Sequence, residues 1–233
     1  MNKTEKIIQT ICYLLKSIKK KQLGKVHLIK LLFFADKYHL LRYGGTISED
    51  DYYAMVNGPV ASTAKDVLDL DADSLDSFYF KMVKNLIVKK YNDNGYYHYT
   101  LKEKAFDYDY DLLSETDVES LNFVIKNMGS WNKTQLVEYS HKYPEWIEHE
   151  KFLKENPGAR SGKIYLEDMF STFKGDILAQ GLTEEDIKCS KELALGQEET
   201  DCFNIYEQAA ITLNSFHSIM AKRSKGKRLV LRT

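Results

Sequence analysis

The segment from Lys25 to Arg42 most constrains the fold of this protein. Its helical stripe comprises Leu28, Leu31, Leu32, Ala35 and Tyr38, and this stripe is widened by Phe33, Phe34, Leu40 and Leu41. A helix that is apolar over so much of its circumference has to be enclosed by other elements. We therefore expect a central helix over residues 25–42, ended by the double glycine that follows.

Two polar residues, Asp36 and His39, stand within this apolar segment. A polar group buried there needs a hydrogen-bond partner, and our first interpretation of both is structural. Asn57-Gly58-Pro59 has the residue types of a turn, because Asn and Gly tolerate positive φ and Pro fixes its own. We expect Asp36 and Asn57 to fix the helix relative to the next strand through hydrogen bonds, with Gly58 and Pro59 setting the turn.

The remaining periodicity predicts further helices and a small amount of sheet. Helices are expected over 4–20 and 60–70, from Ser114 to Gly129, over 132–139, from Pro144, over 166–178, from Thr183, and over 199–223. Strands are expected over 52–56 and in a hairpin of 86–91 with 96–101. The predicted fold class is mainly α (α+β): a compact helical domain with a small antiparallel β-hairpin over residues 1–175, and a helical C-terminal extension with a basic tail over 176–233.

Charge is distributed unevenly along the sequence. Residues 1–44 carry ten Lys or Arg against two acids, whereas residues 45–120 carry seven against sixteen. The last twelve residues carry six basic side chains and no acid. Either the opposite charges face each other or solvent, or the N-terminal helices and the tail form a surface for nucleic acid or an acidic partner.

The sequence favours a cytoplasmic protein without a membrane segment. Three cysteines with no C-x-x-C pairing do not make a disulfide framework and fit a reducing compartment. The N-terminal apolar stretch is interrupted by Gln9 and Lys16 and is interpreted as a folded helix rather than a signal peptide. No apolar run reaches the ~18 residues that a membrane span needs.

Motifs that would indicate an enzyme or a metal site are incomplete. A calcium-loop start at 69–73 lacks the required Gly and Glu at later positions. The segment 158–163 is one residue short of a phosphate loop, and Leu153 stands where a zinc-protease motif beginning at His149 needs its second histidine. A Cys–His nucleophile stays open because such pairs meet only in space. We expect no cofactor, no metal and no enzymatic activity.

Two blocks with a specific order and spacing give the protein a resemblance to a known family. LLFFADKYHL at 31–40 and NGPV at 57–60, with supporting blocks at 117–129 and 136–146, resemble the Panacea domain, the SocA-like antitoxin domain that is also described in phage- and mobile-element-associated proteins. The resemblance covers about residues 5–170. The C-terminal sixty or so residues do not match it.

The resemblance implies a mostly helical fold with a small β element, and a non-enzymatic antitoxin of a type II toxin-antitoxin system. Such a protein neutralises a cognate toxin by binding it directly, and some members also deliver the toxin to an ATP-dependent protease. The family-motif residues with a structural role would be Asp36, Tyr38, His39, Asn57, Gly58 and Pro59. The alternative function is a phage or mobile-element protein that binds a host protein or nucleic acid.

Four aromatic residues are candidates for partner binding, since Tyr and Trp dominate binding hot spots. They are Tyr43, Tyr52, Tyr53 and Trp146. The alternative for each is packing in the core or in a hairpin. The long helix expected over 199–223 would supply a second toxin-contacting element through its apolar face.

Overall fold

The computed structural model describes residues 3–18, 23–91, 95–105, 109–156, 158 and 161–196. Contacts divide the protein into one compact unit, Met1–Ala194, and a second unit, Leu195–Thr233. Every element below belongs to the first unit. The helix predicted over 199–223 and the basic tail lie outside the described residues. The domain boundary predicted near residue 175 stays a prediction, while the contacts of the first unit continue to Ala194.

The described part of the protein is mainly helical with two small sheets, which confirms the predicted fold class. Its α-helices are α1 (Lys3–Ser17), α2 (Lys25–Tyr43), α3 (Ser62–Asp69), α4 (Ser77–Leu86), α5 (Glu115–Met128), α6 (Lys133–Ser140), α7 (Pro144–Glu155) and α8 (Glu184–Ala194). Its strands are β1 (Leu23–Gly24), β2 (Tyr52–Met55), β3 (Gly58–Ala61), β4 (Ile87–Tyr91), β5 (Tyr97–Leu101) and β6 (Gly162–Ile164), and its short 3₁₀ turns are η1 (Glu103–Ala105) and η2 (Asp168–Phe170). None of the described helices is long and apolar enough to cross a membrane.

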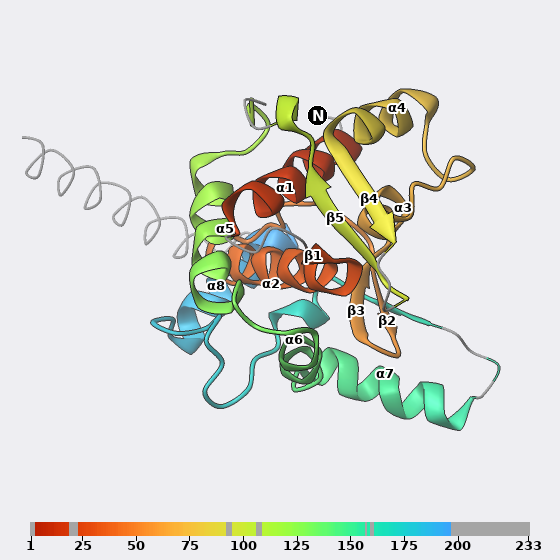
Figure 1. The fold of residues 1–233 in the computed structure, drawn as a ribbon. Coiled ribbons are helices and arrows are strands. Elements are labelled where there is room, and N and C mark those ends of the chain that lie inside the picture. Colours follow the sequence, from red (N-terminus) through yellow and green to blue (C-terminus); the bar gives the residue numbers. More distant parts are fainter. Residues whose placement is uncertain are drawn as a thin grey trace, which may run out of the picture. The chain divides into compact units, whose positions relative to one another are not determined.

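Helix α2 is the central element of this unit (Figure 1). It packs against α1, α3, α5, α6, α8, η2 and strands of both sheets. Its two phenylalanines, Phe33 and Phe34, are completely buried. The helix ends at Gly44, whose left-handed backbone (φ 69°) lets its N–H bond to the Leu40 carbonyl. The predicted central helix is therefore confirmed, and the broad apolar surface is what makes it central.

Two three-stranded antiparallel sheets flank the helices. One has the order β1-β5-β4 and contains the predicted hairpin, with Ile87 opposite Leu101 and Tyr91 opposite Tyr97. The other has the order β3-β2-β6 and brings residues more than a hundred positions apart together, with Tyr53 opposite Lys163. Since side chains alternate across a strand, Tyr52 points into the core and Tyr53 outward.

Two predicted elements are wrong in extent, and α4 was not predicted. The helix expected from residue 60 begins at Ser62, because residues 58–61 pair with β2 and form β3. The helix expected over 166–178 is absent apart from the 3₁₀ turn η2. Its apolar residues Met169, Phe170 and Leu178 are buried one by one, and Gly175 (φ 84°) interrupts any helical continuation.

Replacing Gly58 by Ala should destabilise the unit by about 1–3 kcal/mol, the usual cost of a non-glycine residue at positive φ. Gly58 has φ 91°, and a Cβ there would lie 2.5 Å from Ser140 Oγ and 2.6 Å from Lys30 Nζ. Urea unfolding measures the loss. Gly45→Ala is the matched control, since a Cβ at Gly45 meets nothing within 4 Å. Equal stability of the two variants would contradict the expected strain at Gly58.

Candidate functional site

Asp36 connects the middle of α2 to the segment that leads into β2. Its carboxylate accepts the backbone N–H of Ser48 at 3.0 Å, the Ser48 hydroxyl, and the Tyr52 hydroxyl at 2.7 Å. The side chain is fully buried, and burial raises the pKa of Asp36 from its ordinary 3.8 to about 6, opposed by these hydrogen bonds. Asn57, the other residue expected to fix this geometry, lies exposed in the β2–β3 turn.

His39 joins the C-terminal end of α2 to the start of α5. One ring nitrogen is 2.6 Å from the Gly45 carbonyl, and the other is 3.1 Å from Thr116 Oγ1 and 3.4 Å from an Asp117 oxygen. Burial lowers the pKa of His39, which favours the neutral ring. Tyr38 beside it is buried, with its ring stacked on Phe123 at 4.0 Å between centroids. These two motif residues therefore hold α2 against α5.

The ammonium group of Lys37 lies in the core, where it contacts three groups. It is 2.5 Å from Glu145 Oε1, donates to the Met169 carbonyl at 2.9 Å, and lies 4.0 Å from the centre of the Tyr143 ring. Both charged side chains are completely buried. The Ser171 hydroxyl donates to the other Glu145 oxygen. This ion pair joins α2 to α7 and to the segment after η2.

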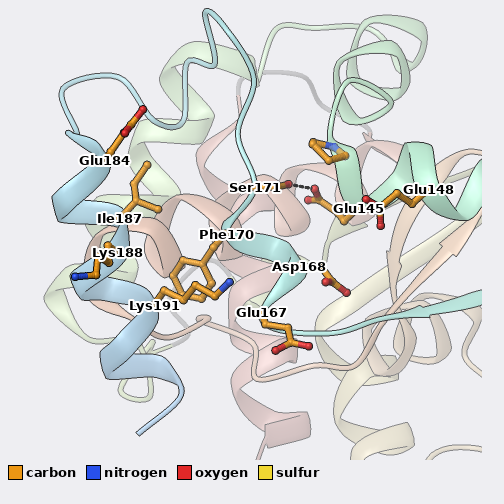
Figure 2. Close-up of a pocket in the computed structure, with 11 residues that line it drawn as sticks. Glu145, Glu148, Glu167, Asp168, Phe170, Ser171, Glu184, Ile187, Lys188 and Lys191 are labelled. Carbon is orange, nitrogen blue, oxygen red and sulfur yellow. Dashed lines mark hydrogen bonds between the residues drawn. The ribbon is translucent and has the colours of Figure 1, made fainter. Parts of the chain in front are cut away.

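A pocket of about 400 Å³ lies next to this ion pair, between α7, η2 and α8 (Figure 2). The Phe170 side chain lies between two helices: α8, which carries Lys188 and Lys191, and α7. The charged residues that line it are Glu145, Glu148, Glu167, Asp168, Glu184, Lys188 and Lys191. Lys188 is also 3.8 Å from Glu185 and 3.5 Å from Glu192. Carboxylates therefore dominate the lining, which suits cationic side chains of a partner. Among the described residues, no group of three or more His, Cys, Asp or Glu could hold a metal ion.

The structure places the four candidate partner-binding aromatics differently. Tyr52 and Trp146 lie inside the unit, only 2% and 6% exposed. The Tyr52 hydroxyl donates to Asp36, and the Trp146 indole donates to the Met55 carbonyl at 3.0 Å. Tyr43 and Tyr53 are partly exposed. Tyr43 donates to Glu119 at 3.1 Å on the outer surface, while Tyr53 stands on the outward side of β2. The buried residues Tyr52 and Trp146 and the partly exposed residues Tyr43 and Tyr53 therefore do not form one site.

Four of the ten basic side chains of the first 44 residues, including Lys37, are paired with acids in the described part of the unit. Lys3 is 3.4 Å from Asp50, Lys6 is 2.9 Å from Asp117, and Lys25 is 2.5 Å from Asp69. Arg42 donates to two carbonyls near residues 178–180. These ion pairs agree with the interpretation in which opposite charges face each other. Lysines 19–21 lie outside the described residues.

Sequence reasoning missed Lys30, Lys37 and Glu145 as residues of interest. The available signal was position: Lys30 and Lys37 are seven residues apart in a helix in which most of the neighbouring residues are apolar. A lysine on a buried helix face needs a partner, just as Asp36 does. The partners themselves could not be identified, because Glu145 and Met169 lie more than a hundred residues away.

One comparison identifies the family of this fold. The family model described as "Antitoxin SocA-like, Panacea domain" matches residues 28–147, about half of the sequence. The chain belongs to the SocA-like Panacea family. Neither the curated proteins nor the solved structures contain a match. The match to this antitoxin-like domain includes nearly all of α2, the hairpin β4–β5, α5 and α6, and it ends just after Trp146. The pocket of Figure 2 therefore lies at the end of the matched Panacea region and beyond it.

The buried Asp36 should make the stability of this Panacea domain depend on pH. Because its folded pKa is raised to about 6, the folded state holds a proton between about pH 4 and pH 6 that the unfolded state releases. This proton stabilises the folded state fully below about pH 4. The free energy of unfolding then falls by on the order of 2–3 kcal/mol as the pH rises through 6. Asp36→Asn cannot ionise. Urea unfolding of both proteins from pH 4 to pH 7 should show wild type losing stability relative to the variant. A constant difference would contradict this.

Replacing one partner of the Lys37–Glu145 pair should lower the free energy of unfolding more than replacing both partners. Lys37→Met leaves Glu145 buried without its counterion, and the expected loss is about 3–5 kcal/mol. The double variant Lys37→Met/Glu145→Leu should recover a large part of it, because no uncompensated charge remains. A double-mutant cycle of urea unfolding measures the coupling. Additive losses would show that the pair does not act as a unit.

Proposed function

We propose that this protein is the antitoxin of a type II toxin-antitoxin system and neutralises a cognate protein toxin by binding it directly. The observation that carries the proposal is membership of the SocA-like Panacea family, described as antitoxin-like. The action is binding rather than catalysis. Delivery of the bound toxin to an ATP-dependent protease is a separate second step, and the half-life of the toxin with and without this protein measures it.

Surface chemistry supports a protein partner. Large apolar side chains stand out of the described surface, including Val56 (83% exposed) in the β2–β3 turn and Tyr91 and Tyr97 on the hairpin. The two hairpin tyrosines pack on each other at 5.0 Å between centroids and present one aromatic surface. Aromatic and aliphatic side chains exposed in this way are typical anchors of protein interfaces. We propose Tyr43 and Tyr53 as further contacts, since their side chains can be reached without opening the core.

Neutralisation tests the proposal directly. The full-length protein is co-produced with the product of the gene next to its own, under conditions in which that product alone arrests growth. We expect growth to be restored and the two proteins to co-purify in fixed stoichiometry. Leu32→Asp is the negative control, since it places a charge at a fully buried position of α2 and should prevent folding. Failure of the soluble, folded protein to relieve the arrest would contradict the antitoxin role.

Salt dependence separates a protein partner from a nucleic acid. At about 1 M salt the Debye length is only ~3 Å, so phosphate-driven binding is largely lost. An interface built on apolar anchors weakens little under the same conditions. We expect the complex to survive this wash and nuclease treatment. Recovery of nucleic acid at low salt, with no protein retained at high salt, would favour the nucleic-acid alternative.

A further inference from the structure

The described residues bury three lysine side chains, and one of them has no acidic partner. Lys6, Lys30 and Lys37 are 7%, 1% and 0% exposed. Lys6 is paired with Asp117 at 2.9 Å and Lys37 with Glu145 at 2.5 Å. Within the part of the protein that the structure describes, the ammonium of Lys30 has no carboxylate within ion-pair distance. Its hydrogen-bond partner is the Pro59 carbonyl at 2.7 Å.

This environment leaves the Lys30 ammonium incompletely compensated. An ammonium has three N–H donors, and a single carbonyl accepts only one of them. Removing such a charge from water without a counterion is unfavourable, and burial accordingly lowers the pKa of Lys30 well below its usual range. Lys37, two helical turns further along α2, shows the complete arrangement with carboxylate, carbonyl and aromatic ring. Lys30 lacks the carboxylate of that set.

Lys30 lines a second pocket, of about 390 Å³, below the β2–β3 turn. Its remaining lining residues come from the start of α2, from the turn, from β3 and from α3, and are Lys25, Val26, Ile29, Met55, Val56, Asn57, Val60 and Lys65. Val56 is the most exposed large apolar residue of the described segments, at 83%. The pocket therefore combines a mainly apolar lining with the side chain of Lys30, whose buried amino group has a lowered pKa and needs a carboxylate beside it to stay charged.

The other two lysines of the pocket are already neutralised. Lys25 is 2.5 Å from Asp69, and Lys65 is 3.2 Å from both Asp66 and Asp69, so two carboxylates face these two ammonium groups. A nucleic-acid backbone would need several available cations in a row, and this lining does not provide them. A single carboxylate on an apolar group matches the pocket better, because apolar side chains contact the lining while the charge meets Lys30.

A polar atom without a partner lies on the same side of the turn as Lys30. The Nε2 atom of His141 is buried and has no hydrogen-bond partner among the described residues. The His141 ring and Lys30 Nζ both crowd Gly58, at 3.1 and 2.6 Å from the position that a Cβ would take. The ring is held in place by stacking on Trp146 at 3.4 Å. Within the segments that the structure describes, an amino group without a carboxylate and an unpartnered ring nitrogen therefore lie together behind the family's Asn-Gly-Pro-Val turn.

We propose that the pocket below the β2–β3 turn binds a carboxylate of the protein partner, carried on an apolar segment, and that Lys30 is its counterion. The carboxylate belongs to an Asp or Glu side chain or to the C-terminal residue of that protein. This inference rests on the proposed function, since it names the chemistry by which the toxin is recognised. Because the Lys30 side chain is only 1% exposed, the proposal requires the exposed turn, with Val56 at its tip, to move aside when the carboxylate binds.

Matched small probes test the site on the full-length protein without the toxin. N-acetyl-L-leucine carries a terminal carboxylate, N-acetyl-L-glutamate 1-amide carries a side-chain carboxylate, and N-acetyl-L-leucinamide is the neutral match of the first. We expect at least one acid to bind by NMR titration and the amide not to bind. Lys30→Met should lower the affinity for that acid at least about tenfold, because one charge-assisted hydrogen bond is lost. Lys25→Met, in the same pocket but paired with Asp69, is the control that keeps binding.

Several outcomes would overturn the site. They are equal affinity of Lys30→Met and wild type for the acid, equal affinity of wild type for acid and amide, or binding of inorganic phosphate in preference to both acids. A readout on the wild-type protein avoids dependence on the folding of the variant: the bound acid should slow acetylation of Lys30 by acetic anhydride, followed by peptide mass spectrometry. Unchanged labelling would also count against the site.

Toxin neutralisation separates failure of this site from failure of the proposed function. If wild type and Lys30→Met neutralise and bind the toxin equally well, the carboxylate site is wrong and the antitoxin role stands. If the acids bind through Lys30 but no toxin is neutralised, the site stands and the antitoxin role is wrong. If Lys30→Met folds, loses acid binding and loses toxin affinity at least about tenfold while Lys25→Met does not, both are supported.

Discussion

Helix α2 can be buried only because distant parts of the sequence supply partners for the charges that it carries. Its apolar residues require enclosure on nearly all sides, and this encloses Asp36 and Lys37 as well. A buried charge without a partner opposes folding by several kcal/mol. The groups that satisfy these two residues lie just before β2 and at its first residue, in α7 and in η2. The burial of one helix therefore fixes the positions of at least three other segments.

This arrangement explains which parts of the fold the sequence predicts. Local sequence patterns are enough to predict the broad apolar surface of α2, the hairpin β4–β5 and the starts of two helices. At those starts, Ser114 and Asn132 each form a capping box with the residue three positions later. These features depend on residues close together in the sequence. Long-range features are not encoded in that way, and β6, with three residues, is too short to give a pattern of its own.

The candidate site is less predictable than the fold for the same reason. The motif residues Asp36 and His39 stand out as polar groups in an apolar helix, but their partners cannot be identified from spacing. Tyr52 and Trp146 have the residue types of interface anchors, and the alternation of β2 and the packing of α7 place them inside. The contrast between Lys37, which has Glu145, and Lys30, which has no such partner among the described residues, is visible only in three dimensions.

At the β2–β3 turn, one residue cannot be substituted without strain, whereas two others can be. Gly58 is fixed by its positive φ and by the side chains around it, whereas Val56 and Asn57, the two residues between β2 and β3, are exposed. Such a division would let the contact surface of this fold diversify while the core stays untouched. Selection for variants with altered partner choice should therefore accumulate substitutions at Val56 and Asn57 while leaving Gly58 unchanged.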